Sequence, residues 1–457
     1  MKRNISLLLS LFLLLGVAGC SPSNGSKRSK NENVLRIASW DEYIDMGGDF
    51  LDPDPENGDG EYIEWYKELT GINLLDAKPL YEEFESWYNE KYPDKKIQVE
   101  YVALQDNETM YNKIKMGDSY DLLCPSEYMA MKLKAEDKLL PFDEDFFNAE
   151  KTDDNQYAKY VSPYTQNVFK KANLDGYIAG YMWGSTGFVF NPEEIAETPE
   201  KSREIMQSWY CLTSDECERK ITAKDNVRDS YFMGLGMYYE KELLALDKNS
   251  EDYATLLSQK MNDTSPETMQ AVKKLLEKAR KNLYGLETDE GKTDVIAGRL
   301  DASYQWSGDA VYIIDEAESE SELALEYAIP SSASNLWFDG WVMMKDANKH
   351  AAQAFVNFLS MPENVIRNMY YIGYTSCLGG EKIYDYVEYS YGTDEGVSYD
   401  LSYFFGEGAI LTTDEAQTRR QLFAQYPDSE TIKRLVVMNY FTKEENERAN
   451  RMWNNIK

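Results

Sequence analysis

The alternation of helix and strand patterns is clearest between residues 80 and 133, LYEEFESWYNEKYPDKKIQVEYVALQDNETMYNKIKMGDSYDLLCPSEYMAMKL. Within this segment we predict helices at Leu80–Lys91, Asn107–Lys115 and Ser126–Leu133, separated by strands at Ile97–Ala103 and Tyr120–Cys124. Strands that alternate with helices indicate a mostly parallel sheet with helices on its faces. Ligands of such sheets lie just beyond the carboxyl ends of the strands.

Further elements are predicted on both sides of this segment. A short strand at Val34–Ser39 ends at Trp40–Tyr43 (WDEY), and an acidic insert rich in Gly and Pro begins at Asp45 and extends toward Pro79. The remaining patterns predict strands at Ala302–Trp306, Leu325–Ile329 and Asp339–Met344, and helices at Tyr62–Leu69, Glu200–Trp209, Ser230–Leu246, Pro266–Leu283 and from His350 and Pro362. A chain of this length normally divides into two or more domains with cores of their own.

The first residues have the pattern of a secretory signal. Lys2 and Arg3 precede a short apolar run, and small residues then lead to Cys20; such a segment is removed on export. The ending VAGC at 17–20 resembles the lipobox of bacterial lipoproteins, which implies a signal peptide at 1–19 and a lipid anchor on Cys20. Residues 20–32 are then a flexible tether. The alternative is an ordinary signal peptide with a chance cysteine.

The chain is strongly acidic. It has 48 Lys and Arg against 80 Asp and Glu, a formal net charge of -32. Such a surface repels nucleic acid and anionic lipid and attracts cations. Because acidic surfaces also serve solubility, the charge shifts the expectation only modestly toward a cationic ligand.

Cysteine and histidine are too few for most metal or catalytic sites. Besides Cys20 the chain has Cys124, Cys211, Cys217 and Cys377, without a Cys-x-x-Cys pair, and a single histidine. We therefore expect no metal site and no cofactor, and no Ser-His-Asp or Cys-His catalysis unless that histidine is the base. Cys211 and Cys217 are close enough for a small disulfide, a question that the sequence leaves open.

Several short motifs follow one another in a fixed order. They are Trp40–Tyr43 (WDEY), Asn107–Lys115 (NETMYNKIK), Tyr120–Tyr128 (YDLLCPSEY), Tyr181–Gly187 (YMWGSTG), Asp225–Asp229 (DNVRD), Trp306–Asp309 (WSGD), Trp337–Asp339 (WFD) and Ile372–Tyr374 (IGY). Their order and spacing resemble those of the spermidine/putrescine-binding proteins of bacterial ABC importers. The resemblance extends over nearly the whole mature chain.

The resemblance implies a fold and a function. The fold is an α/β, two-lobed periplasmic-binding-protein type II fold, in which crossing strands join the lobes and a hinge closes them on a ligand. Residues 33–184 and 338–380 are expected to form the first lobe, and 185–337 and 381–457 the second. The function is capture of a polyamine, putrescine or spermidine, and its delivery to an ABC permease and its ATPase, without catalysis. The protein is expected to be exported and monomeric, anchored to the outer face of the cytoplasmic membrane or located in the periplasm, with no nucleic-acid partner.

The resemblance also implies a ligand site, carried over position by position. Its expected residues are Trp40, Asp41, Glu42, Tyr43, Ser126, Tyr128, Asp229, Trp306, Asp309, Trp337 and Asp339. In the family, indoles stack on the methylene chain, and a carboxylate at the position of Asp339 pairs with a buried ammonium. Asn226 departs from spermidine-binding members, which carry aspartate there, and Met438 stands where such members have glutamine. Asp309 is a carboxylate, as in putrescine-type members.

These residue types suit a polyamine for physical reasons. Each ammonium offers three donors, and its removal from water is costly unless a carboxylate meets it. Indole and phenol faces bury the methylenes and attract the adjacent cations, each by roughly 0.5 to 2 kcal/mol. The expected site is therefore an aromatic box with acids at its ends.

Structural and functional alternatives remain. Trp337 is in a position typical of a core residue, and Asp309 is as well placed to cap the helix at Ala310–Ile314 as to bind a ligand. A binding protein of the same fold for a sugar or another organic cation is the main functional alternative, although the expected set contains acids with only Arg228 as a neighbouring base. An exported hydrolase with two carboxylates, or an adhesin or sensor subunit, is the remaining possibility.

Overall fold

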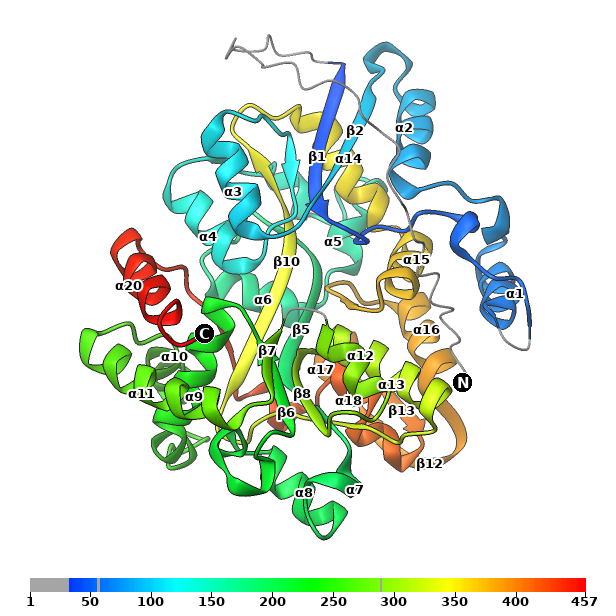
Figure 1. Ribbon diagram of the computed structural model, residues 1–457. Helices are drawn as coiled ribbons and strands as arrows, with labels where there is room; N and C mark the ends of the chain where they lie inside the picture. Colours follow the sequence, from blue (N-terminus) through cyan, green and yellow to red (C-terminus); the bar gives the residue numbers. More distant parts are fainter. Residues whose placement is uncertain (1–32, 56–57, 288–289) are drawn as a thin grey trace, which may run out of the picture.

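The computed structural model describes residues 33–55, 58–287 and 290–457. Two α/β lobes lie one above the other in Figure 1, and two long strands, β5 (Ala179–Phe190) and β10 (Ser334–Met344), run through both of them. These strands pair antiparallel, from Leu336 opposite Ser185 to Trp341 opposite Ala179. We call the lobe that holds β1 to β4 the first lobe, and the lobe that holds β6 to β9 the second lobe.

Short strands complete the sheets. They are β1 (Val34–Trp40), β2 (Gln98–Leu104), β3 (Leu122–Leu123), β4 (Leu139–Leu140), β6 (Ile221–Lys224), β7 (Gly285–Glu287), β8 (Ala302–Trp306), β9 (Glu326–Ala328), β11 (Thr375–Ser376), β12 (Gly392–Asp400), β13 (Ile410–Thr413) and β14 (Leu435–Val437). The main order is β2-β1-β3-β10-β5-β8-β6-β7. β1 is parallel to β2 and β3, and β6 is parallel to β7 and β8, so each lobe has a group of strand carboxyl ends.

Helices cover these sheets. They are α1 (Gly60–Thr70), α2 (Leu80–Lys91), α3 (Asn107–Met116), α4 (Glu127–Ala135), α5 (Gln156–Tyr160), α6 (Pro163–Lys171), α7 (Pro192–Ile195), α8 (Pro199–Met206), α9 (Val227–Leu244), α10 (Tyr253–Met261), α11 (Pro266–Asn282), α12 (Glu290–Ile296), α13 (Ser307–Ser321), α14 (Lys349–Leu359), α15 (Pro362–Ile372), α16 (Glu381–Tyr391), α17 (Ser402–Phe405), α18 (Gln421–Gln425), α19 (Ser429–Ile432) and α20 (Lys443–Trp453). In Figure 1, α2, α3 and α14 lie with the first lobe, and α8, α9 and α11 with the second.

Local capping explains where the helices near the lobe junction begin. The side chain of Asn226 accepts hydrogen bonds from the N–H groups of Arg228 and Asp229, which fixes both residues in the first turn of α9. Asp106 accepts from the N–H of Thr109 and starts α3 in the same way. Such caps satisfy N–H groups that have no partner within the helix. Asn226 stands where spermidine-binding proteins carry an aspartate. In this chain it has a structural role, because it caps α9.

The mixed α/β architecture confirms the predicted fold class, and several elements agree in detail. The helix predicted at Leu80–Lys91 and the strand predicted at Ala302–Trp306 are confirmed to the residue. The strand predicted at Tyr120–Cys124 is shorter, because only Leu122–Leu123 pair with β1 and β10. Cys211 and Cys217 are both buried and free.

The acidic insert and α16 pack together. The rings of Tyr62 in α1 and Tyr370 in α15 stack with centroids 3.5 Å apart, and Trp65 of α1 stacks on Tyr389 of α16 at 4.4 Å. The insert also carries Asp45, whose carboxylate is buried against Arg367 at 2.6 Å. Helix α16 therefore contacts elements of the first lobe, although the expected division assigns residues from 381 onward to the second lobe.

Candidate functional site

Asp339 lies within β10, and its carboxylate gathers residues of the first lobe. Its Oδ2 accepts a hydrogen bond from the indole Nε1 of Trp40 at 3.1 Å and another from the hydroxyl of Tyr43 at 2.8 Å. Trp40 is the last residue of β1, and the register between β10 and β5 shifts directly after Asp339. Such irregularities often re-aim a side chain next to a site. Asp339 is only 5 % exposed, so the strand end and the shift bring a buried acid to the lobe junction.

The carboxylate of Asp339 has acceptor capacity to spare. Within the described part of the chain, its Oδ1 has no hydrogen-bond partner. A carboxylate accepts about four hydrogen bonds in all. Burial raises the pKa of Asp339, and hydrogen bonding with the side chains of Ser126, Tyr43 and Trp40 offsets this rise only in part. A donor that carries a positive charge would stabilise the ionised form most.

A second buried acid, Glu127, lies beside Asp339. Its Oε2 accepts a hydrogen bond from the backbone N–H of Phe338 at 3.2 Å. Burial, followed by the charge of Asp339, raises the pKa of Glu127 to about 8. Two buried carboxylates that lie close together do not both ionise readily. Burial beside Asp339 therefore lets Glu127 keep its proton to a higher pH than an exposed glutamate does, because its pKa is raised.

Ser126 is held directly opposite Asp339. The two residues form an isolated antiparallel bridge between the backbones of the chain before α4 and β10. The amide side chain of Asn107 donates to the Ser126 hydroxyl at 2.9 Å and accepts from the Ser126 N–H at 3.1 Å. The start of α3 thus fixes the hydroxyl of Ser126 next to the acid.

Asp309 binds two lysines of the second lobe. Its Oδ2 is 3.2 Å from Nζ of Lys224, and its Oδ1 is 2.9 Å from Nζ of Lys292 and accepts from the Tyr374 hydroxyl at 3.1 Å. Burial alone would raise the pKa of Asp309, but the two lysines outweigh it and the net pKa is lowered. The helix α13 starts directly after Trp306, which is its N-cap residue. Asp309 is therefore not the cap of this helix, which corrects that alternative.

Lys224 also covers Trp306. Its Nζ lies 4.1 Å from the centroid of an indole ring of Trp306, so the same ammonium contacts both an aromatic face and a carboxylate. Asp229, in the first turn of α9, is buried nearby. Burial raises the pKa of Asp229 to about 6, although the charges of Lys224 and Arg228 oppose the rise.

Tyr374 links the two clusters. Its ring lies 5.9 Å from that of Tyr43 and 5.4 Å from that of Trp337, while its hydroxyl bonds Asp309. Trp337 is 7 % exposed, and its indole N–H donates to the carbonyl of Ser185 at 3.0 Å. Trp337 is thus part of the core as well as a neighbour of the cluster. The structure joins the Asp339 and Asp309 clusters through aromatic contacts at the junction of the lobes.

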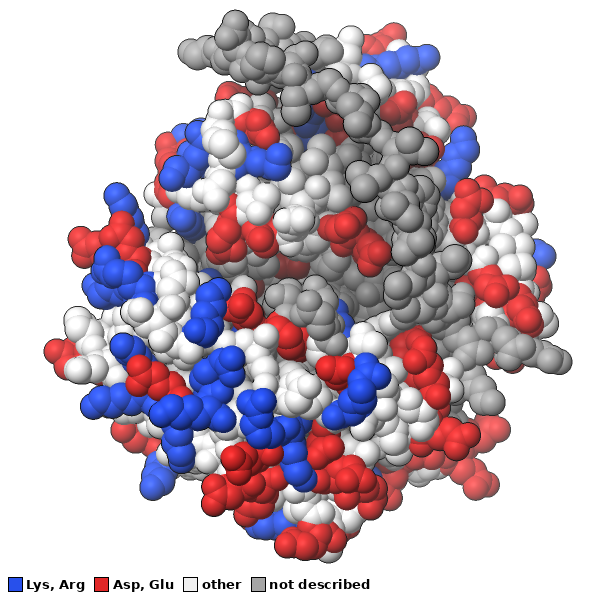
Figure 2. Space-filling model, viewed as in Figure 1, with Lys and Arg blue, Asp and Glu red and all other residues white. Residues whose placement is uncertain are grey.

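The remaining expected residues lie toward the edge of this region. Tyr128 is half-buried, its hydroxyl donates to Glu108 at 3.3 Å, and the guanidinium of Arg228 lies 4.2 Å above its ring. Asp41 and Glu42 are exposed in the turn after β1. Figure 2 shows a hollow across the middle of this face, between the two lobes, with Asp and Glu side chains on both of its rims.

Four residues of the site were not expected from the sequence: Lys224, Lys292, Glu127 and Tyr374. Lys224 had a signal, because it ends the short apolar strand Ile221–Lys224 at a strand carboxyl end. Tyr374 belongs to the quoted IGY motif. The sequence predicted a site of acids with Arg228 as the only neighbouring base. Lys224 and Lys292 correct this description, because they add two positive charges to the site.

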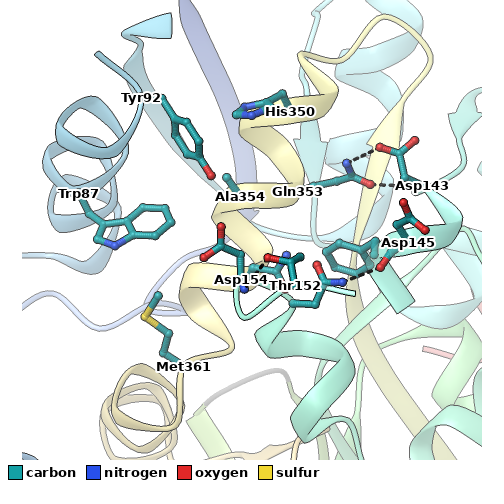
Figure 3. Close-up of a pocket in the computed structure, with 13 residues that line it drawn as sticks. Trp87, Tyr92, Asp143, Asp145, Thr152, Asp154, His350, Gln353, Ala354 and Met361 are labelled. Atoms are coloured by element: carbon teal, nitrogen blue, oxygen red, sulfur yellow. Dashed lines mark hydrogen bonds between the residues drawn. The ribbon is translucent and has the colours of Figure 1, made fainter. Parts of the chain in front are cut away.

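A second hollow lies in the first lobe, away from these clusters. It has a volume of about 260 Å³ and is lined by Trp87, Tyr92, His350 and Met361 among others (Figure 3). Its acids already have cationic partners: Asp143 lies 2.6 Å from Lys349 and Asp154 lies 2.5 Å from Lys91. This hollow therefore offers no acid comparable to Asp339.

Some expectations fall outside these observations. Cys20, the signal at 1–19 and the tether at 20–32 lie outside the described residues. None of the helices in the described ranges has the length and apolar character needed to cross a bilayer. In the same ranges, His, Cys, Asp and Glu form no group of three or more that could hold a metal ion.

The sequence pattern of one protein family matches most of these elements. The pattern of the bacterial extracellular solute-binding proteins matches residues 82–380, which include Ser126, Asp229, Trp306, Asp309 and Asp339. The chain belongs to this family. Its members are extracellular solute-binding proteins.

Individual relatives agree with this assignment. A putrescine/agmatine-binding protein of Pseudomonas aeruginosa is 22 % identical over 203 residues, which cover 43 % of this chain and 50 % of the relative. The alignment thus spans only half the length of that curated relative. Among solved structures, a spermidine/putrescine ABC transporter substrate-binding protein of Streptococcus pneumoniae, in complex with calcium and HEPES, is 25 % identical with a TM-score of 0.57, covering 93 % of this chain and 98 % of that one. A lipoprotein of Treponema pallidum is 16 % identical with a TM-score of 0.60, covering 93 % and 99 %. These likenesses confirm the periplasmic-binding-protein fold with two lobes.

Proposed function

We propose that this protein captures a polyamine, putrescine or spermidine, between its lobes and delivers it to an ABC importer. The observation that carries the proposal is Asp339, a buried acid between the indole of Trp40 and the phenol of Tyr43. An ammonium group there would gain a carboxylate with two aromatic side chains beside it, which offsets the cost of leaving water. The relatives from Pseudomonas and Streptococcus, named as a putrescine/agmatine-binding protein and a spermidine/putrescine ABC transporter substrate-binding protein, support the same ligand class.

The eleven expected residues take different parts in this proposal. Asp339, Trp40, Tyr43 and Ser126 would hold one ammonium group, while Trp337 and Trp306 would flank the methylene chain. Asp229 and Asp309 belong to the second lobe, and Tyr128 lies at the edge between the lobes. Asp41 and Glu42, which are exposed, would attract the cation toward the entrance.

A second candidate is a solute with polar groups of both kinds, such as a sugar or a zwitterionic amine. Lys224, Lys292 and Arg228 favour it, because they place positive charge among the acids. A sugar or a carboxylate could accept hydrogen bonds from these groups. Putrescine could not.

We further propose the setting in which this capture takes place. Cleavage of the signal at 1–19 would leave a lipid on Cys20, the tether at 20–32 and a monomeric domain at the outer face of the cytoplasmic membrane. Residues 33–184 and 338–380 would move as the first lobe, together with α16 because of its contacts with α1. Residues 185–337 and the rest of the chain after α16 would move as the second. The permease and its ATPase would receive the ligand, and no catalysis is involved.

Calorimetric titration of the purified protein with putrescine, spermidine, maltose and lysine tests the function. We expect at least one of the two polyamines to bind with roughly micromolar or lower Kd, and maltose and lysine to bind far more weakly. Tight binding of maltose or lysine, or heat from none of the four, would contradict the proposal. Chemical cleavage of the ligand recovered after incubation would indicate turnover and would favour the alternative function of a hydrolase.

A further inference from the structure

Lys224 places an ammonium group of the protein itself inside the candidate site. Its side chain is 2 % exposed, and its Nζ lies 3.2 Å from Asp309 and 4.1 Å from the ring centroid of Trp306. A carboxylate on one side and an indole face on another are the two contacts that a buried ammonium of a ligand requires. Lys224 therefore has the chemical environment expected for one end of a polyamine.

Lys292 adds a second positive charge at this carboxylate. Its Nζ lies 2.9 Å from Oδ1 of Asp309, the oxygen that also accepts from the Tyr374 hydroxyl. Oδ2 faces Lys224, so both oxygens of Asp309 are engaged by residues of the chain. A further ammonium at Asp309 would lie next to two like charges, which disfavour it.

We propose that Lys224, supported by Lys292, determines specificity by occupying the Asp309 position, so that the site selects a polyamine with two ammonium groups over one with three. The inference rests on the proposed function and names its preferred ligand. Two acids besides Asp309 remain for a diamine, Asp339 at the first lobe and Asp229 at the second, although Lys224 and Arg228 also place positive charge near Asp229. Asp229 is 7 % exposed and is fixed in the first turn of α9 by the Asn226 cap.

The three charges of spermidine have no comparable set of partners. Putrescine requires only two acids, one from each lobe, while the third ammonium of spermidine would have to displace Lys224 or remain without a carboxylate. Displacement would remove the Lys224 ammonium from both Trp306 and Asp309. Removal of the lysine ammonium should therefore favour the triamine more than the diamine.

The test is a calorimetric titration of putrescine and spermidine into the wild-type chain and into Lys224→Met. We expect the wild type to bind putrescine at least about tenfold more tightly than spermidine, and the variant to lower this ratio of Kd values about tenfold. Lys220→Met is the matched control, because Lys220 precedes the same strand and pairs with Asp301 at 3.3 Å. It should keep the wild-type ratio.

The outcomes separate this inference from the proposed function. A ratio unchanged in Lys224→Met, or a wild type that prefers spermidine, overturns the specificity role while polyamine binding stands. Absence of binding by the wild type overturns both. A lysine with a merely structural role would lower the melting temperature and weaken both ligands alike. If Lys224→Met does not fold, Lys292→Met replaces it, since Lys292 is more exposed and should shift the ratio in the same direction.

Discussion

At the scale of single residues, the site combines acids whose pKa values are shifted in opposite directions. Asp309 is held ionised by two lysines, whereas Glu127 is buried beside another acid and its pKa is raised to about 8. A cation bound at Asp339 would favour the ionised form of Glu127 and lower its pKa. Polyamine binding should therefore release a proton.

This proton release gives a testable pH dependence. Affinity for putrescine should rise as the pH increases from 6 to about 8 and then level off, with about one proton released near pH 7. Calorimetry in two buffers with different ionisation enthalpies measures the release, and Glu127→Gln should reduce it to nearly zero. A wild type that releases no proton would contradict the role given to Glu127.

The same shift affects stability without ligand. A raised pKa means that the folded protein holds the Glu127 proton more tightly than the unfolded chain does. In the unfolded chain, the pKa of this carboxyl has its ordinary value of 4.5. The contribution of the protonated Glu127 to the free energy of unfolding is therefore fully present below pH 4.5 and is lost as the pH rises through about 8.

Residues differed in how far the sequence revealed them. The acids and aromatic residues around Asp339 were expected because they follow a family resemblance and suit an ammonium ligand. Lys224 was not, since a lysine at the end of a strand is usually exposed, and only the fold shows that Asp309 and Trp306 enclose it. Charge balance within a buried site depends on partners that are distant in the chain.

At the scale of elements, a cation-π contact joins helices of the two lobes. The Arg228 guanidinium on α9 lies 4.2 Å from the ring centroid of Tyr128 on α4 and 4.3 Å from that of Phe441. Stacking of this kind contributes about 0.5 to 2 kcal/mol, more when water is excluded. Because it links helices of different lobes, the contact should stabilise the arrangement in which the lobes are close.

Replacement of Arg228 by glutamine should therefore speed ligand release. We expect a dissociation rate constant about tenfold higher with little change in the association rate, measured by stopped-flow tryptophan fluorescence. Arg219→Gln is the matched control, since Arg219 lies over Tyr284 within the second lobe. Equal release rates in the two variants would argue against an interlobe role for Arg228.

Elements with strong periodicity were predictable, and those shaped by long-range packing were not. The helix Leu80–Lys91 has an apolar stripe that fixes both its type and its length. β3 is only Leu122–Leu123, because the ladder to β1 and β10 ends where the chain turns into α4. The side of the molecule on which α16 packs depends on aromatic contacts with α1, which no local pattern indicates.

At the scale of the whole molecule, the two crossing strands place the strand carboxyl ends of both lobes around one junction. Trp40 ends β1 and Trp306 ends β8, and both reach the clusters that Tyr374 connects. This arrangement, rather than any single motif, makes an interlobe site for a slender cation possible. The order of helices and strands predicted an α/β sheet, and the family resemblance implied two lobes joined by crossing strands, while the packing of the lobes against each other required the structure.

Titration of putrescine into the wild type and into Asp339→Asn measures directly how much the charge of this one carboxylate contributes to affinity. The amide can still accept from Trp40 and Tyr43 but cannot neutralise an ammonium, so affinity should fall about thirtyfold or more, with a nearly unchanged melting temperature without ligand. Asp154→Asn, in the separate hollow of Figure 3, is the control and should bind as the wild type does. Wild-type affinity in Asp339→Asn would contradict the placement of the ligand at the lobe junction.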